Sequence, residues 1–254
     1  MLMSAPRWTG LVVLAGSVAL LALPLTARAG DVDVGVEWIN KFPDNPGCDR
    51  LYNRDDCAKG LYNYFRLHGW TGRFCNGNND AWEEHWKEAS NGGTDGSYCD
   101  RCDIAMVATH GNSSGFAFNS SHDDQDLLRT EANWGDDDDL EWIILDACGC
   151  LAQGTHVNWH SVYNHLHTIL GFDTNAHDKM TRGFWFSYKA FRGYTVVQSW
   201  WYACELTEGS STDAAAMGVY RANNTYGDHI HGEGSVASDS SSPTSFWYYS
   251  HNCD

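Results

Sequence analysis

Basic residues are scarce in this chain. Lysine and arginine number 16 against 33 aspartates and glutamates, which gives a formal net charge of −17. Nucleic acids and anionic membrane surfaces are bound through clustered lysine and arginine side chains. The composition therefore argues against both as partners. It is compatible with cationic substrates, with calcium, or simply with a well-solvated acidic surface.

Proline and long apolar runs are scarce as well. Five prolines in 254 residues form no proline-rich linker, and beyond residue 25 no apolar stretch is long enough to cross a membrane. The chain begins with Arg7, an apolar run from Leu11 to Leu25 and the sequence Ala27-Arg28-Ala29, a pattern typical of a cleaved secretory signal. We therefore expect a signal peptide over 1–29 and one exported domain over 30–254, secreted or periplasmic, without membrane insertion.

Cysteine is abundant and its number is odd. In an exported protein most of the nine cysteines are expected to form disulfides, and an odd count leaves at least one thiol over. Local bridges are plausible between Cys48 and Cys57 and within Cys99-x-x-Cys102. The remaining pairs stay open, and parity alone does not decide whether the free thiol is Cys148 or Cys150.

Apolar strand-like segments alternate with helical patterns along the chain. This alternation predicts an α/β fold with a mostly parallel sheet covered on both faces. We expect strands over 32–39, 168–172 and 214–222, and a small hairpin arm over 115–119. The spacing of apolar residues predicts helices over 54–68, 80–89, 155–166, 179–192 and 196–206, the last two separated at Gly193.

Two apolar runs each end at a potentially reactive side chain. Residues 103–109 lead into His110-Gly111, and residues 141–145 lead into Asp146-Ala147-Cys148. If both runs are neighbouring parallel strands, their carboxyl ends deliver the imidazole and the thiol to one edge of the sheet. Open α/β sheets bind ligands in the crevice at that edge. The pair therefore predicts a cysteine nucleophile with a histidine base.

The chemistry of acyl transfer explains these residue types. A thiol attacks a carbonyl as the thiolate, so it needs a proton acceptor nearby, which His110 supplies. Gly111 permits a sharp turn and leaves room for a substrate. The amides of Gly111 and Cys148 are the predicted donors of an oxyanion hole.

These two motifs resemble the signature of the caspase-like cysteine peptidases of clan CD, which include caspases, metacaspases, legumains, gingipains and clostripain. Their pattern is an apolar strand ending in His-Gly, followed some tens of residues later by an apolar strand ending in an acidic residue or Gln, a small residue and Cys. The resemblance covers residues 103–151 well and extends more loosely to 206. In place of the His-Ser-Gly that follows the metacaspase cysteine, this chain has Gly149-Cys150.

The resemblance implies a three-layer α/β/α sandwich, stapled here by the expected disulfides, and a cysteine endopeptidase acting on polypeptides. It assigns His110 as general base or acid and Cys148 as nucleophile, with no cofactor required. In relatives an acidic residue two positions before the cysteine helps to bind the P1 side chain. Asp146 holds that position, so the resemblance implies a preference for Arg or Lys at P1.

Metal ions offer alternative uses for other residues. The acidic stretch 122–139 and its surroundings contain the possible calcium ligands Asp136, Asp138 and Glu141, although their spacing does not match an EF-hand. Cys99-x-x-Cys102 and Cys148-x-Cys150 together are one alternative for a zinc site, and a zinc hydrolase would be built on the histidines, as in His156-x-x-x-His160. No Glu stands between the two histidines in the metalloprotease position, and disulfides are the better account of the cysteines.

A binding protein is the alternative from a different functional class. In that case His110 and Cys148 would be a structural histidine and cysteine at strand ends, with the thiol locked in a disulfide. Tryptophan and tyrosine number twelve each, and aromatic rings at a surface hold peptides or glycans. The candidate patches are 200–202 and 246–249. Aromatic clusters of this kind more often belong to the hydrophobic core. The first patch lies in an expected helix that must pack against the rest of the protein, which favours this interpretation.

Overall fold

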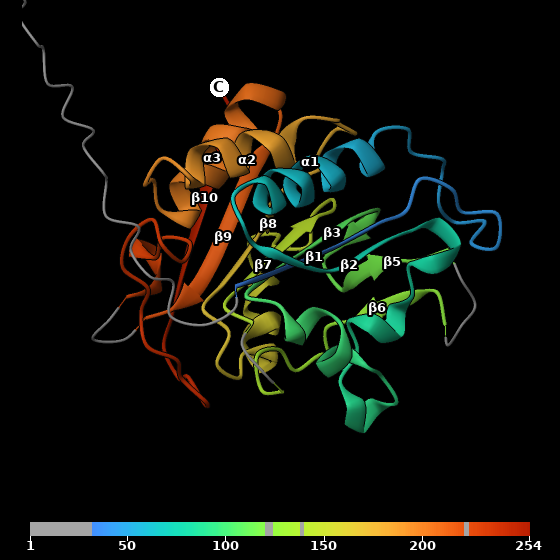
Figure 1. Ribbon diagram of the computed structural model, residues 1–254. Helices are drawn as coiled ribbons and strands as arrows, with labels where there is room; N and C mark the ends of the chain where they lie inside the picture. The colour runs from blue at the N-terminus through green and yellow to red at the C-terminus, as the bar shows by residue number, and fades with distance from the viewer. Residues whose placement is uncertain (1–31, 120–123, 138–139, 221–223) are drawn as a thin grey trace, which may run out of the picture.

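The computed structural model describes residues 32–119, 124–137, 140–220 and 224–254. The expected signal peptide therefore lies outside the described residues. A seven-stranded sheet with the order β10-β9-β8-β7-β3-β1-β2 runs through the molecule (Figure 1). Its strands are β1 (Asp33–Trp38), β2 (Thr71–Gly77), β3 (Ile104–Ala108), β7 (Trp142–Asp146), β8 (Thr168–Phe172), β9 (Asp213–Val219) and β10 (Phe246–Asn252).

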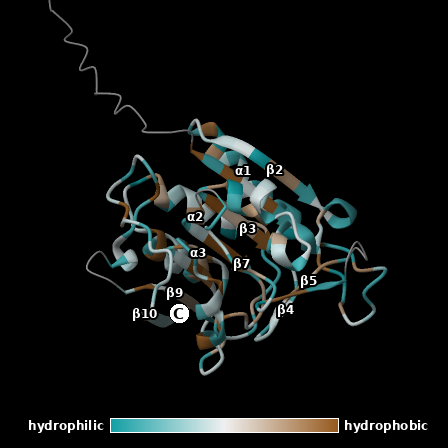
Figure 2. Cartoon of the chain, turned by 90° about the horizontal axis from the view of Figure 1, so that it is seen from below, coloured by the Kyte–Doolittle hydropathy of each residue, from teal (hydrophilic) through white to brown (hydrophobic). Residues whose placement is uncertain are grey.

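The predicted α/β class with a mostly parallel sheet is confirmed. Strands β2, β1, β3, β7 and β8 pair in parallel, and β9 is antiparallel to both β8 and β10. Every residue of β3, β7 and β8 is buried, and Figure 2 shows hydrophobic segments in the interior around β3. A strand covered on both faces needs a continuous apolar run, which is why the sequence reveals these strands so clearly.

The three α-helices of the described residues all cover the same face of the sheet (Figure 1). They are α1 (Arg54–Leu67), α2 (Arg182–Ala190) and α3 (Val196–Thr207), close to their expected ranges. The predicted separation of the last two at Gly193 is confirmed, since this glycine has a φ of +73°. A capping box between Thr195 and Gln198 then starts α3.

The opposite face is covered by short 3₁₀ segments and a small sheet, rather than by α-helices. The helix expected over 80–89 is instead three separate turns, η1 (Asn78–Asp80), η2 (Glu83–His85) and η3 (Ala89–Asn91). The helix expected over 155–166 is the 3₁₀ segment η6 (His156–Val162). The small sheet consists of β4 (Gly111–Asn112), β5 (Gly115–Ala117) and β6 (Asp126–Leu128), which confirms the hairpin after His110.

The expected disulfides are absent, since all nine cysteines lie within the described residues and all are free thiols. The structure does not pair Cys48 with Cys57. Cys48 packs against one apolar cluster, whereas Cys57 lies in the other, where its thiol donates to Asp146. The thiols of Cys99 and Cys102 interact instead with Asp100 and with the carbonyl oxygen of Tyr98. In the part of the chain that the structure describes, no helix has the length and apolarity of a membrane span.

Candidate active site

The two predicted motifs meet at one edge of the sheet. Strands β3 and β7 are parallel neighbours in which Ala108 pairs with Asp146, and the N–H of Thr109 donates to the carbonyl of Asp146 at 3.2 Å. His110 lies two residues after Ala108, and Cys148 lies two residues after Asp146. The expectation that neighbouring parallel strands deliver both residues to the same edge is therefore confirmed.

Gly111 lies directly against the turn that carries Cys148. A Cβ atom at this glycine would come within 2.7 Å of the sulfur of Cys150 and 2.8 Å of the Cβ of Ala147. Any side chain at this position would thus push the two strand ends apart. The glycine of the His-Gly pair is required by close approach of the two motifs, in addition to any role of its amide.

His110 is held in one orientation by its surroundings. Its Nε2 lies 2.7 Å from the carbonyl oxygen of Asp49, which can only accept a hydrogen bond, so Nε2 carries the proton. The ring of Phe42 packs beside the imidazole, with 5.0 Å between ring centroids. In the neutral imidazole Nδ1 is then the basic nitrogen, and it is available to take a proton from a nucleophile.

Cys148 and Cys150 differ in their access to solvent. Cys148 is half-buried, and its sulfur accepts the backbone N–H of Ala176 at 3.3 Å. Cys150 is fully buried, and burial raises the pKa of its thiol, which makes it a poor nucleophile. Exposure therefore favours Cys148 as the reactive thiol, a choice that the cysteine count left open.

The turn after β7 fixes which backbone amides are available. The amide of Ala147 donates to Leu145 at 2.8 Å, and the amide of Gly149 donates to Thr174 at 3.0 Å. Gly149 has a φ of +59°, a left-handed conformation that favours glycine. Within this turn an oxyanion hole would thus use the amide of Cys148, as expected, together with that of Gly111.

Asp146 is placed differently from the expectation. Its side chain is completely buried, forms a 2.9 Å ion pair with Arg54 and a second ion pair with Arg182, and accepts the thiol hydrogen of Cys57 at 3.2 Å. Burial by itself would raise the pKa of Asp146, but Arg182 and Arg54 hold it below its usual value. Because its charge is already neutralised by two arginines, Asp146 does not offer a free carboxylate to a basic P1 side chain.

Further acidic groups complete this buried network. Arg182 also forms an ion pair with the buried carboxylate of Glu208, and Arg54 lies 3.4 Å from Asp178. Asp178 in turn accepts the backbone N–H groups of Tyr52 and Asn53 at 2.6 and 3.1 Å. The network thereby ties the loops after β1, β7, β8 and α3 together beneath the candidate dyad. No local sequence pattern predicts that these charges converge, because the residues are far apart along the chain.

The expected metal ligands are dispersed. Glu141 belongs to a group with Asp103 and His231, and the potential ligand atoms of these three residues lie within 4.8 Å of one another. Asp136 instead interacts electrostatically with Glu88 and Asp137. Glu141 and Asp136 thus belong to different clusters, and Asp138 lies outside the described residues.

The helical spacing expected for a zinc pair is not realised. Residues 156–162 form a 3₁₀ segment, so the α-helical i, i+4 spacing expected for His156 and His160 does not occur. Each stacks on a ring of β10, His156 on Tyr248 and His160 on Phe246, with centroid distances of 3.8 and 3.9 Å. These histidines serve packing against the edge strand.

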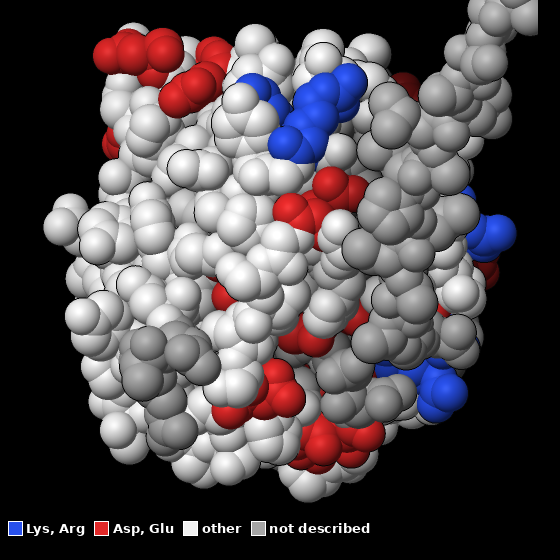
Figure 3. All heavy atoms as spheres, turned by 60° about the vertical axis from the view of Figure 1, so that its left-hand side comes forward, with Lys and Arg blue, Asp and Glu red and all other residues white. Residues whose placement is uncertain are grey.

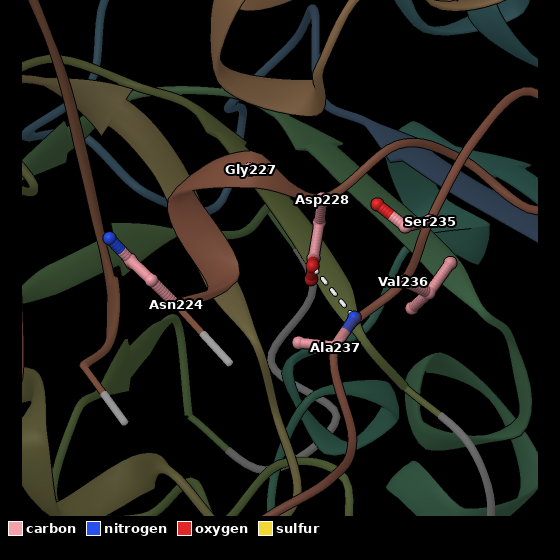
Figure 4. A pocket seen from close by; sticks show the side chains of 6 residues that line it. All are labelled: Asn224, Gly227, Asp228, Ser235, Val236 and Ala237. Carbon is pink, nitrogen blue, oxygen red and sulfur yellow. Dashed lines mark hydrogen bonds between the residues drawn. The ribbon is translucent and has the colours of Figure 1, made fainter. Parts of the chain in front are cut away.

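A pocket lies near the amino-terminal ends of the parallel strands, opposite to the candidate dyad. Asn224, Gly227, Asp228, Ser235, Val236 and Ala237 line a cavity of about 320 Å³ (Figure 4). Asp228 accepts the amide of Ala237 at 2.8 Å and bonds Nδ1 of His167 at 2.7 Å. His167 directly precedes β8, so this pocket faces away from the carboxyl ends of the parallel strands, where Cys148 lies.

The aromatic patches divide between core and surface. Trp200 is fully buried, and its Nε1 donates to Gly171 at 3.0 Å. Trp201 and Tyr202 instead line an open cavity of about 220 Å³ between α3 and β10. Of the second patch, Trp247 is buried and Tyr249 is exposed.

Comparisons with known proteins give a family but no activity. No curated protein matches the chain. The family described as "Domain of unknown function (DUF6345)" matches residues 36–251, a range that includes His110, Cys148 and the loops around them. The chain therefore belongs to the DUF6345 family.

Proposed function

We propose that this protein is a cysteine endopeptidase that uses His110 and Cys148, exported by its N-terminal segment. The observation that supports the proposal is the parallel pairing of β3 with β7, with Gly111 packed against the Cys148 turn. This places a half-exposed thiol and an oriented imidazole at the edge where α/β sheets bind ligands. The pair fulfils the requirement for a nucleophile and its base at one site.

The reaction follows from the tautomer of His110. Nδ1 takes the thiol proton of Cys148, and the thiolate attacks the scissile carbonyl carbon. The amides of Gly111 and Cys148 stabilise the oxyanion that forms. The imidazolium then protonates the leaving amine, and water, deprotonated by the same imidazole, hydrolyses the thioester to release the acid and the thiol.

In this proposal the substrate is a polypeptide, and Asp146 does not select a basic P1 residue. The carboxylate is balanced by Arg54 and Arg182, so it adds little attraction for an incoming cation. The dyad requires no metal or organic cofactor for its proton transfers.

Hydrolysis of fluorogenic peptides that differ only at P1 (Arg, Lys, Asn or Asp) tests the proposal. The mature protein is assayed under mild reduction beside Cys148→Ala and His110→Ala. Cys75→Ala is the matched control, because Cys75 is also a half-buried thiol but lies on the edge strand β2. Loss of cleavage in both dyad variants, with the control unchanged, supports the peptidase. No cleavage of any peptide, together with no alkylation of Cys148 by iodoacetamide, contradicts it.

A binding protein is the second candidate, and the cavity beside α3 favours it. Trp201 and Tyr202 line this cavity together with Tyr194, Gln198 and Glu205, a mixture of rings and polar groups typical of sites that hold glycans or peptides. A glycan array read out with the wild type and Trp201→Ala tests this function. Binding that disappears in the variant, in a protein inactive on all peptides, would favour it over the peptidase.

A further inference from the structure

Two carboxylates lie together at the amino-terminal edge of the sheet. Asp103 and Glu141 each directly precede a strand, and the first residues of these strands, Ile104 of β3 and Trp142 of β7, pair in parallel. The carbonyl oxygen of Asp103 accepts the amides of Glu141 and Trp142 at 3.2 and 3.1 Å. The strand pairing that joins the candidate dyad at one edge therefore joins two acidic side chains at the opposite edge.

His231 approaches both carboxylates from a loop near the end of the chain. Its Nε2 lies 3.2 Å from Oδ1 of Asp103 and 2.9 Å from Oε1 of Glu141. All three ligand atoms lie within 4.8 Å of one another. Atoms that bind one zinc ion at about 2.0–2.2 Å are separated by about 3–3.5 Å. Both distances from His231 are thus close to those between ligands of a shared ion.

Hydrogen bonds outside the group hold its members in place. The backbone N–H of Asp33 donates to Oδ2 of Asp103, so that Oδ1 remains beside His231. Ile230, directly before the histidine, is fully buried. The N–H of Glu233 donates to the carbonyl of Ile230 at 3.0 Å, which closes a turn around His231. Outer hydrogen bonds of this kind orient the ligands of protein metal sites.

The group is buried on one side and open to solvent on the other. The side chains of Asp103 and Glu141 are only 5% and 7% exposed, whereas that of His231 is 29% exposed. An ion held by these three ligands would keep a position open to water through the side of the histidine. Three protein ligands with one open position are typical of zinc sites that retain an exchangeable ligand.

A buried hydrogen-bond donor beside His231 is a second sign of a ligand. The ring of Trp142 packs against the imidazole with 5.2 Å between ring centroids. The Nε1 of Trp142 is buried and has no hydrogen-bond acceptor among the described residues. A buried donor is costly without an acceptor, and an oxygen ligand on the open position of an ion supplies one.

The donor atoms favour one class of ion. Acidic side chains also form several separate groups on one outer face (Figure 3), but exposed carboxylates are solvated and need no ion. Calcium and magnesium select oxygen ligands, whereas zinc binds imidazole nitrogen together with carboxylate oxygen. Because His231 contributes a nitrogen, Glu141 is better placed as a zinc ligand than as the calcium ligand expected from the sequence.

We propose that Asp103, Glu141 and His231 bind one zinc ion, which fastens the loop of His231 to the start of β3 and β7. The imidazole releases its proton to solvent on binding, because a ligating nitrogen must be deprotonated. In the metal-free protein the ion pairs of His231 with both carboxylates hold the loop instead. The site lies at the opposite edge from His110 and Cys148, so it stands independently of the proposed peptidase.

Zinc content and thermal unfolding of the mature protein test the site. The protein is treated with a chelator and brought to equilibrium with zinc by dialysis, and the bound metal is counted by elemental mass spectrometry. Wild type should hold one zinc ion per chain more than His231→Gln. Zinc should also raise the Tm of the wild type by about 5 °C or more, because it binds the folded state, and this shift should be lost in the variant.

Two further variants make the comparison specific. Glu141→Gln keeps a hydrogen-bonding group beside His231 but removes a charged ligand, so it should lose the same ion while circular dichroism stays native. His229→Gln is the matched control, because His229 lies on the same loop and its Nδ1 contacts the carbonyl of Ser235 at 3.4 Å. The control should keep both the ion and the Tm shift.

Differences between variants separate this site from zinc held by the cysteines. The nine thiols are present in every variant, so any ion that they bind cancels in the comparison. Equal zinc content in wild type and His231→Gln would mean that a shared proton alone bridges the three side chains, and would overturn the proposal. A calcium shift of the Tm larger than the zinc shift would overturn it as well, since it would indicate a site made of oxygen ligands.

Discussion

The Nε2 atom of His110 lies 2.7 Å from the carbonyl oxygen of Asp49. A backbone carbonyl sets the tautomer without contributing a charge, so this histidine is oriented by the loop after β1 rather than by a carboxylate. The loop is itself anchored by Asp178, which accepts the amides of Tyr52 and Asn53. The geometry of the candidate base therefore depends on loops from three different strands.

Gly111→Ala should separate the two halves of the dyad. The new methyl group would overlap the sulfur of Cys150 and the Cβ of Ala147, so the His110 loop must move away from Cys148. We expect peptide hydrolysis to fall by at least about 100-fold, because small misplacements of catalytic groups are costly, while circular dichroism stays native. Gly209→Ala is the control, since a Cβ there meets nothing within 4 Å. Unchanged activity in Gly111→Ala would contradict the dyad geometry.

Asp146→Asn should lower stability rather than alter P1 preference. The substitution leaves Arg54 and Arg182 buried without their shared carboxylate, and breaking a buried ion pair costs about 3–5 kcal/mol. Denaturant unfolding measures this loss. Asp55→Asn, which removes a partly exposed pair with Lys59, should cost no more than about 1 kcal/mol. The opposite result would be a stable Asp146→Asn variant that loses a preference for Arg or Lys at P1. That result would show that Asp146 binds the P1 side chain, as the family resemblance implies.

His231 should make stability depend on pH in the alkaline range. Burial would lower its pKa, but Asp103 and Glu141 raise it to about 10, against 6.5 in the unfolded chain. The ion pairs at 3.2 and 2.9 Å therefore stabilise the fold fully below pH 6.5, and this contribution is lost as the pH rises towards 10. The free energy of unfolding of wild type minus that of His231→Gln should shrink between pH 6 and 10. A flat profile for His231 would contradict its pairing with Asp103 and Glu141.

The sequence revealed those parts of the fold whose burial is continuous. Strands β3, β7 and β8 are covered on both faces, so each appears as an apolar run. The edge strands β2 and β10 were missed as strands because one side of each faces solvent and their sequences, Thr71–Gly77 and Phe246–Asn252, mix polar with aromatic residues. Edge strands have no continuous apolar signal.

The false helix predictions arose from buried aromatic residues outside helices. Trp86 and Trp159 are fully buried and create apparent helical spacing, but each is fixed by tertiary contacts. The Nε1 of Trp86 donates to Glu37 at 2.7 Å, and that of Trp159 donates to the carbonyl of Cys150 at 2.7 Å. The positions of His110 and Cys148 followed from strand order, whereas the neutralisation of Asp146 required contacts between α1, β7 and α2 that no local pattern shows.

Cys204 and Cys253 should form the disulfide that the local pairings did not provide. The two buried thiols interact electrostatically with each other, and a bridge between them would join the end of α3 to the residue after β10. Oxidised glutathione should convert them to a disulfide, with two thiols oxidised and one glutathione disulfide reduced to two thiols. Closing this loop should stabilise the fold by about 3–4 kcal/mol and raise the Tm by about 10 °C. Peptide mapping without reduction should find this bridge while Cys148 remains alkylatable, and Cys204→Ala should lose the redox-dependent shift. A bridge that instead joins Cys148 to Cys150 would remove the nucleophile and contradict both this pairing and the proposed peptidase.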